Sequence, residues 1–137
     1  MSGILVDTCI WSDALRNRSP KNVAIAEQLK ALIDENRVKI IGVIRLELLS
    51  GYSDVQRYEK LRGKMQWFPN EAVLDEDYET AARFSNICRT NGVQGSHIDF
   101  LICAVAVRLK LQIFTTDRDF LNYAQYLPVK LFQASTI

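Results

Sequence analysis

Short apolar runs alternate along the chain with longer segments in which apolar residues recur every three or four positions. The first pattern is typical of buried strands, and the second of helices that pack one face on a core. Val23, Ala26, Leu29 and Ile33 share one face of a helix that Pro20 begins. The pattern predicts strands at 3–7, 38–43, 111–116 and 129–133, a further short strand within 71–74, and helices at 8–16, 20–36, 44–49, 54–64, 75–89, 97–110 and 119–125.

Strands and helices therefore alternate from end to end. Such an order is typical of an α/β fold, in which helices cover both faces of a parallel sheet. A chain of 137 residues has the size of one domain, and no repeat, low-complexity segment or internal linker interrupts it. We treat residues 1–137 as a single domain.

Composition narrows the class of protein. Hydrophobic residues make up 48% of the chain and charged residues 24%, which is typical of a globular protein. The net charge is only +1. Most dedicated duplex binders carry a strong basic excess, so a nucleic acid would have to be held here by a local patch or through metal ions.

Cysteine usage and hydropathy indicate a cytoplasmic protein. Cys9, Cys88 and Cys103 are odd in number, widely spaced and without a paired motif, which is typical of a reducing compartment. No secretory pattern follows Met1. The longest apolar stretch, 98–107, is about half the ~20 residues that a membrane helix needs and contains an acid, so we expect no membrane partner.

Four acids are embedded in apolar segments. Asp7 and Asp117 each follow an apolar strand, Asp99 interrupts the stretch 98–107, and Glu47 lies among leucines. An ionised carboxylate buried without a partner is costly, so each of these acids needs a hydrogen-bond donor, a proton or a metal. The same need for a partner therefore recurs at four places in the chain.

Helix capping is the structural alternative for three of these acids. Ser96 and Asp99 have the spacing of a capping box, and Asp7 and Asp117 precede predicted helices. Each aspartate taken singly is better explained as a cap. Glu47 fits less well, because it lies a turn inside its helix; an ordinary surface glutamate is its alternative.

Taken together, the acids indicate a metal site. The carboxyl ends of neighbouring parallel strands lie ~5 Å apart, so Asp7 and Asp117 would meet at one sheet edge if their strands are neighbours. Asp99 joins them if its helix starts near that edge. Two carboxylates ~4 Å apart repel by about 4 kcal/mol at an effective dielectric of 20, and a divalent cation would offset this repulsion.

The ligand types indicate which cation and which chemistry. Oxygen-only ligands suit Mg²⁺ or Mn²⁺, whereas zinc sites usually recruit cysteine or histidine. The one histidine, His97, is better explained as a loop or hydrogen-bonding residue, which disfavours a serine–histidine or cysteine–histidine nucleophile. Magnesium held by acids favours phosphoryl chemistry, because the metal makes water a better nucleophile and stabilises charge on the phosphate.

Two charged segments have simpler interpretations. The run 75–77 places three acids at a helix start, where they face the positive end of its dipole, and Tyr78 is expected on the buried side of that helix. The segment 54–64 is the most cationic in the chain, and a solvated helix face explains it better than an RNA cradle.

Four segments in order resemble the signature blocks of PIN-domain ribonucleases, in particular the VapC toxins of bacterial toxin–antitoxin pairs. The segments are 5–11, 45–51, 97–104 and 115–120. The resemblance runs from about residue 4 to the end; one block alone is weak, but four in order are specific. It implies a PIN-like three-layer α/β/α fold with a central, mainly parallel, doubly wound sheet. It also implies a Mg²⁺-dependent endoribonuclease, with Mn²⁺ as the alternative metal.

The resemblance also implies roles for particular residues. Four acids would hold the metal and carry out catalysis: Asp7, Glu47, Asp99 and Asp117. Three residues would support them, Asp119 as an auxiliary acid and Thr8 and Thr115 through their hydroxyls. Cys9 departs from the serine or asparagine of many relatives, and a thiol is the weaker donor. Arg45, Arg118 and the segment 57–64 are candidates for phosphate contacts.

Partners follow from the same resemblance. An RNA substrate, with a transfer RNA as one option, would be cut to leave 3′-hydroxyl and 5′-phosphate ends. A VapB-like antitoxin would neutralise the protein by lying along a groove, for which Trp11 and Leu15 are candidates, although core packing is commoner for such residues. A homodimer is expected.

Three alternatives stay open at this point. A receiver-like phosphoacceptor domain has a similar length and pattern, but it needs a pair of acids where Asp7 is followed by Thr8 and Cys9. A haloacid-dehalogenase-type phosphatase needs an aspartate at position 9. A PIN-like module that binds RNA or protein without cutting it is disfavoured by the complete set of acids.

Overall fold

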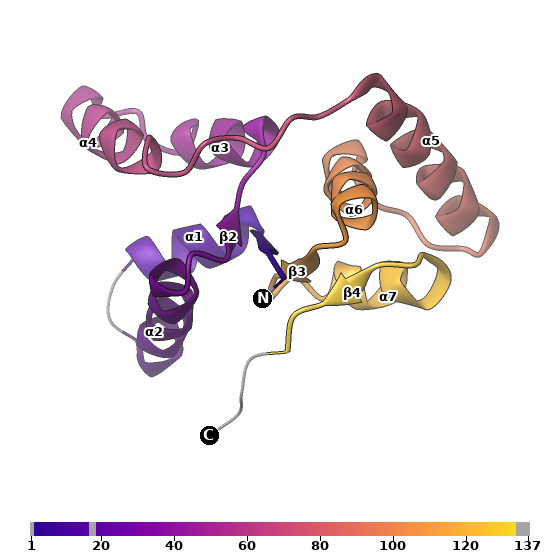
Figure 1. Ribbon diagram of the computed structural model, residues 1–137, viewed down its shortest axis with the longest axis horizontal. Coiled ribbons are helices and arrows are strands. Elements are labelled where there is room, and N and C mark those ends of the chain that lie inside the picture. The colour runs from indigo at the N-terminus through magenta and orange to yellow at the C-terminus, as the bar shows by residue number, and fades with distance from the viewer. Residues whose placement is uncertain (1, 17–18, 134–137) are drawn as a thin grey trace.

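The computed structural model describes residues 2–16 and 19–133 of the chain. These residues form a central sheet with helices on both sides of it (Figure 1). The strands are β1 (Ile4–Val6), β2 (Val38–Lys39), β3 (Gln112–Phe114) and β4 (Lys130–Leu131). The helices are α1 (Thr8–Leu15), α2 (Pro20–Asp34), α3 (Gly42–Leu49), α4 (Val55–Met65), α5 (Asp75–Thr90), α6 (His97–Leu109) and α7 (Asp119–Tyr126).

The strand order confirms the expected α/β/α fold with a doubly wound sheet. The order is β2-β1-β3-β4, and all three pairings are parallel. The chain begins in the middle at β1, moves outward to β2, and then returns to the other side of β1 to form β3 and β4. This change of direction between β1 and β3 is the point where ligands bind in open α/β sheets, beyond the carboxyl ends of the strands.

The segment 38–43 is a shorter strand than its apolar character predicts. Pairing stops after Lys39, Ile40 makes an isolated bridge to Asn70, and Ile41 is already the N-cap residue of α3. A strand end and the buried start of a helix are both apolar, so sequence does not separate them. The short strand expected within 71–74 is also wrong, because contact with the sheet edge ends with the Glu71 N–H donated to Ile40 O at 2.8 Å.

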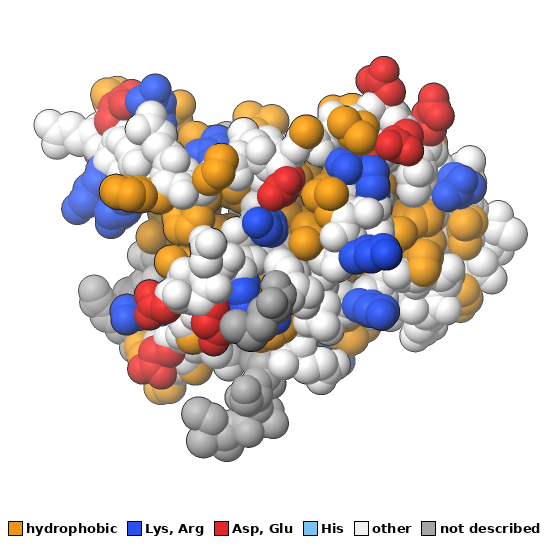
Figure 2. All heavy atoms as spheres, in the orientation of Figure 1, with side chains coloured by type: hydrophobic (Ala, Val, Ile, Leu, Met, Phe, Trp, Pro, Cys, Tyr) orange, Lys and Arg blue, Asp and Glu red, His pale blue; other side chains and the backbone are white. Residues whose placement is uncertain are grey.

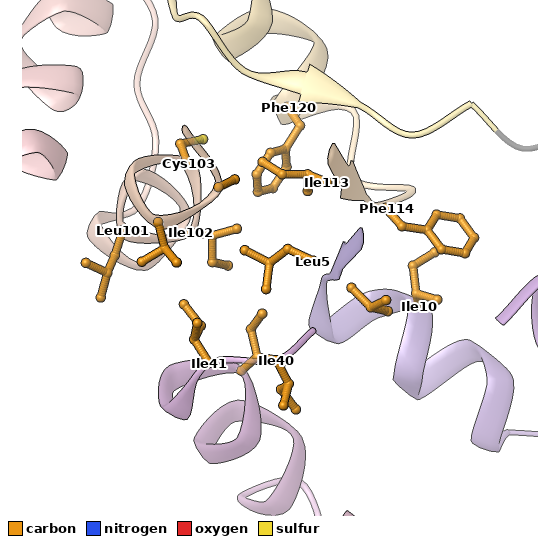
Figure 3. Packing of buried hydrophobic residues seen from close by; sticks show 14 of the residues in the cluster. Leu5, Ile10, Ile40, Ile41, Leu101, Ile102, Cys103, Ile113, Phe114 and Phe120 are labelled. Carbon is orange, nitrogen blue, oxygen red and sulfur yellow. The ribbon is translucent and has the colours of Figure 1, made fainter. Parts of the chain in front are cut away.

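The core fixes α6 against the sheet. All three residues of β1 are fully buried, and Phe100 to Ala106 of α6 form an unbroken buried run. Figure 3 shows Ile102 of α6 facing Leu5 of β1, with Ile40 and Ile41 approaching from below. Ser96 caps this helix by accepting the Asp99 N–H at 3.0 Å, and Lys110 ends it in a left-handed conformation at φ 57°. The start of α6 therefore has a fixed position relative to β1.

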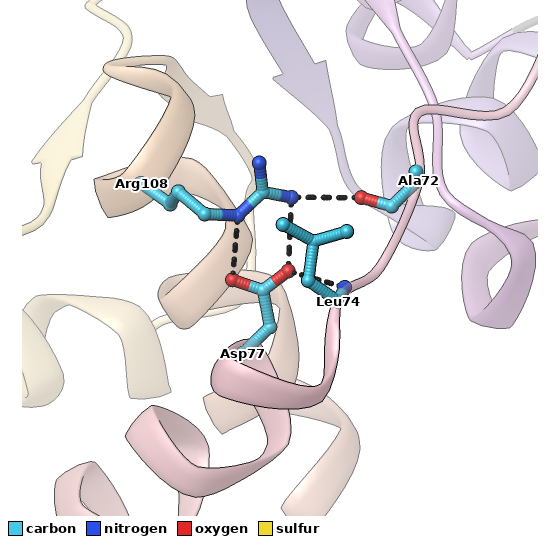
Figure 4. A network of polar contacts seen from close by, with 4 residues as sticks. All are labelled: Ala72, Leu74, Asp77 and Arg108. Atoms are coloured by element: carbon cyan, nitrogen blue, oxygen red, sulfur yellow. Dashed lines mark hydrogen bonds and ion pairs between the residues drawn. The ribbon is translucent and has the colours of Figure 1, made fainter.

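Asp77 is buried and paired, which differs from the exposed dipole charge expected for it. It accepts two hydrogen bonds from the guanidinium of Arg108 on α6, at 2.8 and 2.9 Å, and a third from the Leu74 N–H (Figure 4). Arg108 also donates to Ala72 O at 2.8 Å. Burial raises the pKa of Asp77, but the bonds from Arg108 and Leu74 outweigh it, so the pKa lies below its usual value.

The surface near the start of α5 differs in part from the sequence prediction. Tyr78 is 56% exposed, so its expected burial is wrong. Figure 2 shows acidic side chains gathered where α5 begins, with hydrophobic side chains on the surface beside them. Among the described residues, no helix is long and apolar enough to cross a membrane.

Arg108→Met tests the Asp77 pair. The substitution leaves a buried carboxylate without its cation, and we expect Tm at pH 7 to fall by on the order of 10 °C. Because the folded pKa of Asp77 is lowered, the pair stabilises fully above the ordinary value of 3.8 and loses its contribution as pH falls through the folded pKa. Thermal unfolding followed by circular dichroism at pH 7 and pH 2 measures both effects.

A matched control uses an exposed ion pair. Arg62→Met breaks the ion pair with Glu59, in which both side chains are about half exposed. This substitution should leave Tm nearly unchanged. An equal loss of Tm at both pH values for Arg108→Met would show that lost packing, and not the charge pair, explains its effect.

Candidate metal centre

Asp7 lies where β1 ends and α1 begins. It is 6% exposed, and it caps α1 by accepting the Thr8 N–H on Oδ1 at 2.8 Å. Its other oxygen, Oδ2, accepts the hydroxyl of Thr115, which follows β3, also at 2.8 Å. The capping role therefore exists, but it leaves Asp7 held between the two central strands at their carboxyl ends. Capping and a role in the site are compatible.

Glu47 approaches the same edge from α3. Its carboxylate is exposed, and Oε1 accepts the Thr8 hydroxyl at 2.8 Å. Repulsion from Glu47 also contributes to the raised pKa of Asp7. Thr8 thus joins the two acids, with its backbone N–H on Asp7 and its hydroxyl on Glu47.

Three more acids cluster beside Asp7. Asp99, Asp117 and Asp119 each offer a carboxylate oxygen, and these oxygens lie within 4.8 Å of one another. Asp99 is half-buried at the start of α6. Asp117 is exposed in the turn that follows β3, and Asp119 is exposed as the first residue of α7. Asp117 accepts the Asp119 N–H at 2.9 Å and donates its own N–H to Thr115 at 3.0 Å, which fixes this turn.

Burial and mutual repulsion shift two of these acids. Desolvation raises the pKa of Asp7, although the bonds from Thr115 and Thr8 oppose the shift. Desolvation also raises the pKa of Asp99 to about 6, opposed by the Tyr123 hydroxyl and reinforced by repulsion from Asp7 and Asp117. The site therefore carries a charge arrangement that favours a bound cation or proton.

The structure brings all of the predicted acids to one edge of the sheet, and the two threonines to the acids. Their roles in metal binding and catalysis stay predictions. Cys9 lies among them, with Sγ 3.7 Å from Asp7 Oδ2 and 3.4 Å from Thr115 Oγ1, and it accepts the Thr116 N–H at 3.4 Å. The thiol therefore takes part in fixing the loop after β3.

The candidates for phosphate contacts separate in the structure. Arg118 is exposed between two acids of the cluster. Arg45 instead donates to Asn70 Oδ1 at 3.1 Å, to Met65 O at 3.0 Å and to Phe68 O, so its guanidinium holds the connection after α4. This leaves Arg118 as the stronger candidate of the two.

The sequence singles out three other residues, Trp11, Leu15 and His97. Trp11 is buried and donates its indole N–H to Val6 O at 3.2 Å, so it packs in the core, while Leu15 is 41% exposed. His97 is exposed and lines a cavity of about 480 Å³ between α5 and α6.

Tyr123 and Gly95 belong to the site, and sequence reasoning missed both. Tyr123 donates its hydroxyl to Asp99 at 2.7 Å from a fully buried position. Gly95 leaves room for the Tyr123 ring, which a Cβ at position 95 would overlap. The tyrosine shares its helical face with Phe120 and has the pattern of a core residue, so the sequence carries no signal for its bond to Asp99.

The donor set fits a hard divalent cation. The clustered donors are carboxylate oxygens, which Mg²⁺ and Mn²⁺ prefer, and zinc's usual histidine and cysteine ligands are absent from the described acidic group of Asp99, Asp117 and Asp119. Fold and site together define an α/β protein with a cluster of acids at its topological switch point.

Comparisons with known proteins assign the family. The family model described as "PIN domain" matches residues 4–126, so the chain belongs to the PIN-domain family. This membership contradicts the receiver-like and haloacid-dehalogenase alternatives. No curated protein sequence matches the chain.

Solved structures share its fold. The chain is similar to FitAcB from Neisseria gonorrhoeae, with a TM-score of 0.73, 20% identity, and coverage of 95% of this chain and 96% of that one. It is also similar to VapBC2 from Rickettsia felis bound to a promoter DNA fragment, with a TM-score of 0.76, 14% identity and coverage of 96% and 98%. A toxin–antitoxin complex from Klebsiella pneumoniae is similar too, with a TM-score of 0.67, 17% identity, and coverage of 86% of this chain and 90% of that one.

Asp99→Asn tests the electrostatics of the metal-free site. Because the folded pKa of Asp99 is raised from 3.8 to about 6, its contribution to stability is complete below about pH 4 and is lost as pH rises through 6. In EDTA at pH 7, Asp99→Asn should therefore be more stable than the wild type by roughly 1–2 kcal/mol. At pH 4 the difference should nearly vanish.

Urea unfolding at the two pH values measures the difference. Asp34→Asn, which changes an exposed acid at the end of α2, is the control and should behave like the wild type at both. If Asp99→Asn were less stable than the wild type at pH 7 in EDTA, the ionised Asp99 carboxylate would not be destabilised by burial and repulsion, and this explanation would be wrong.

Proposed function

We propose that the protein is a Mg²⁺-dependent endoribonuclease that hydrolyses RNA phosphodiester bonds and acts as the toxin of a toxin–antitoxin pair. The observation that carries the proposal is the convergence of Asp7, Glu47, Asp99, Asp117 and Asp119 at the switch point of a PIN-domain chain. Asp7, Asp99 and Asp119 stand at the starts of three different helices, which capping alone would explain. Capping does not require these helix starts to meet at one place despite the repulsion among their acids.

The acids divide into a buried and an exposed part. Asp7 and Asp99 would hold Mg²⁺, or Mn²⁺, from the protein side, and Asp117 from the solvent side, with Glu47 completing the site directly or through water. When bound, the ion offsets the repulsion among the acids, makes water a better nucleophile and stabilises charge on the phosphate and leaving oxygen. Asp119 would serve as an auxiliary acid.

The remaining residues of the site position these acids and meet the substrate. Thr115 and Thr8 hold Asp7 and Glu47 through the hydroxyl bonds described above. Arg118 is exposed beside the acids and is suited to a phosphate of the RNA backbone. Asp117 and Asp119 are exposed as well, so an RNA strand has access to this side of the acids.

The partners of the proposal are an RNA, an antitoxin and a second copy of the chain. A transfer RNA is one option for the substrate, cut to 3′-hydroxyl and 5′-phosphate ends. The fold's similarity to structures named as toxin–antitoxin and VapBC complexes supports a VapB-like antitoxin. The homodimer stays a prediction.

Cleavage of RNA tests the proposal. Antitoxin-free wild type should cut total cellular RNA with Mg²⁺ or Mn²⁺ and stop in EDTA. Asp7→Asn and Asp99→Asn should each lower the rate by roughly 100-fold or more, because each removes a charge from the cation site. Asp34→Asn should cut at the wild-type rate, because Asp34 ends α2 just before β2 begins, and so lies toward the amino ends of the parallel strands, opposite the acids.

The assay has a clear opposite outcome. If folded wild type bound RNA and left it intact with either metal, the chain would be a non-cleaving PIN-like module. If both site variants cut as fast as the wild type, the acids would be helix caps and the catalytic proposal would be wrong.

A further inference from the structure

A fully buried tyrosine, Tyr123, is hydrogen-bonded to one acid of the cluster. Tyr123 lies in α7, one turn after Phe120, and its hydroxyl donates to Asp99 Oδ2 at 2.7 Å. A buried phenol requires a partner for its O–H, and here a half-buried carboxylate provides it. The bond joins α7 to the start of α6, so it links two of the elements that carry the clustered acids.

The position of the Tyr123 ring is fixed by three neighbours. The rings of Phe100 and Phe120 lie with their centroids 4.9 and 5.1 Å from it, in tilted and edge-on arrangements that attract aromatic rings. Gly95 closes the third side, because any Cβ there would overlap the phenol. These neighbours hold the ring where its hydroxyl reaches Asp99.

Asp99 is consequently held at two points. Its backbone N–H donates to Ser96 Oγ at 3.0 Å, and its carboxylate accepts the Tyr123 hydroxyl. Gly95 and Ser96 are adjacent, so one turn supplies both the cap of α6 and the space for the ring. The same carboxylate places an oxygen within 4.8 Å of oxygens of Asp117 and Asp119.

We propose that Tyr123 is a positioning residue for Asp99, and that its hydroxyl holds this carboxylate in the orientation from which it binds a divalent cation together with Asp117. The inference rests on the proposed metal-dependent function and adds a residue outside the four acids. Tyr123 acts through Asp99, because its buried side chain has no access to the substrate. Partners that orient a metal ligand typically change metal affinity or activity by 10–100-fold when they are removed.

Tyr123→Phe tests the inference, since it keeps the ring and its two aromatic contacts and removes only the hydroxyl. We expect the Kd for Mn²⁺, measured by calorimetric titration of the metal-free protein, to rise roughly tenfold. At equal Mn²⁺, kcat for RNA cleavage should fall while KM for RNA stays at the wild-type value. Tyr126→Phe, which removes a hydroxyl from the partly exposed end of the same helix, should change neither quantity.

Gly95→Ala provides a second variant, which keeps the hydroxyl but forces the ring away from Asp99. Its Kd for Mn²⁺ should rise in the same direction, and it gives the answer if Tyr123→Phe does not fold. Wild-type Mn²⁺ affinity in a folded Tyr123→Phe protein would overturn the inference and leave Tyr123 as a packing residue. A wild type that binds no Mn²⁺ would instead contradict the proposed function, and this inference with it.

Discussion

The parallel pairing of β1 with β3 is the constraint on which the site depends. It sets Val6 beside Phe114, so the residues that follow, Asp7 and Thr115, are side by side and joined by a hydrogen bond. The buried run of α6 then places Asp99 at the same edge. Backbone pairing and core packing, which do not involve the carboxylates of the acids, therefore supply the free energy that holds like charges together.

The cost of this arrangement appears in the acids themselves. Asp7 and Asp99 both have raised pKa values, because they are removed from water and lie near other carboxylates. Asp77 shows the opposite case, since Arg108 compensates its burial and lowers its pKa. A protein that needed only stability would pair its buried acids in the second way. The unbalanced acids gather where the sheet provides a ligand site, as is common for functional carboxylates.

The sequence predicted those features of the fold that depend on residues close together in the chain. Alternating strands and helices predicted the parallel sheet, because this pattern depends on neighbouring residues. The meeting of Asp7 and Asp117 was conditional on their strands being neighbours, and the pairing of β1 with β3 meets that condition. The place of Asp99 was conditional on where α6 starts, which is set by packing against β1. Tyr123 and Asp99 are separated by 24 positions, and no local pattern links them.

Other differences have the same physical origin. Arg45 is a residue type that often contacts phosphate. In the structure its guanidinium instead donates hydrogen bonds to Met65 O at the end of α4 and to Asn70 in the connection that follows. Ile40 and Ile41 continue an apolar run beyond the point where the strand ends, because the start of α3 is buried too. In each case a tertiary contact decides between two structures that the local sequence allows equally.

The most direct measurement of the central claim is the anomalous scattering of Mn²⁺ in crystals of the protein grown without antitoxin and soaked in MnCl₂. A peak bound by carboxylate oxygens of Asp99 and Asp117, and missing from crystals of Asp99→Asn, is the expected result. Density that places Mn²⁺ elsewhere, or none at the acids at millimolar concentrations, would show that these carboxylates are not a cation site.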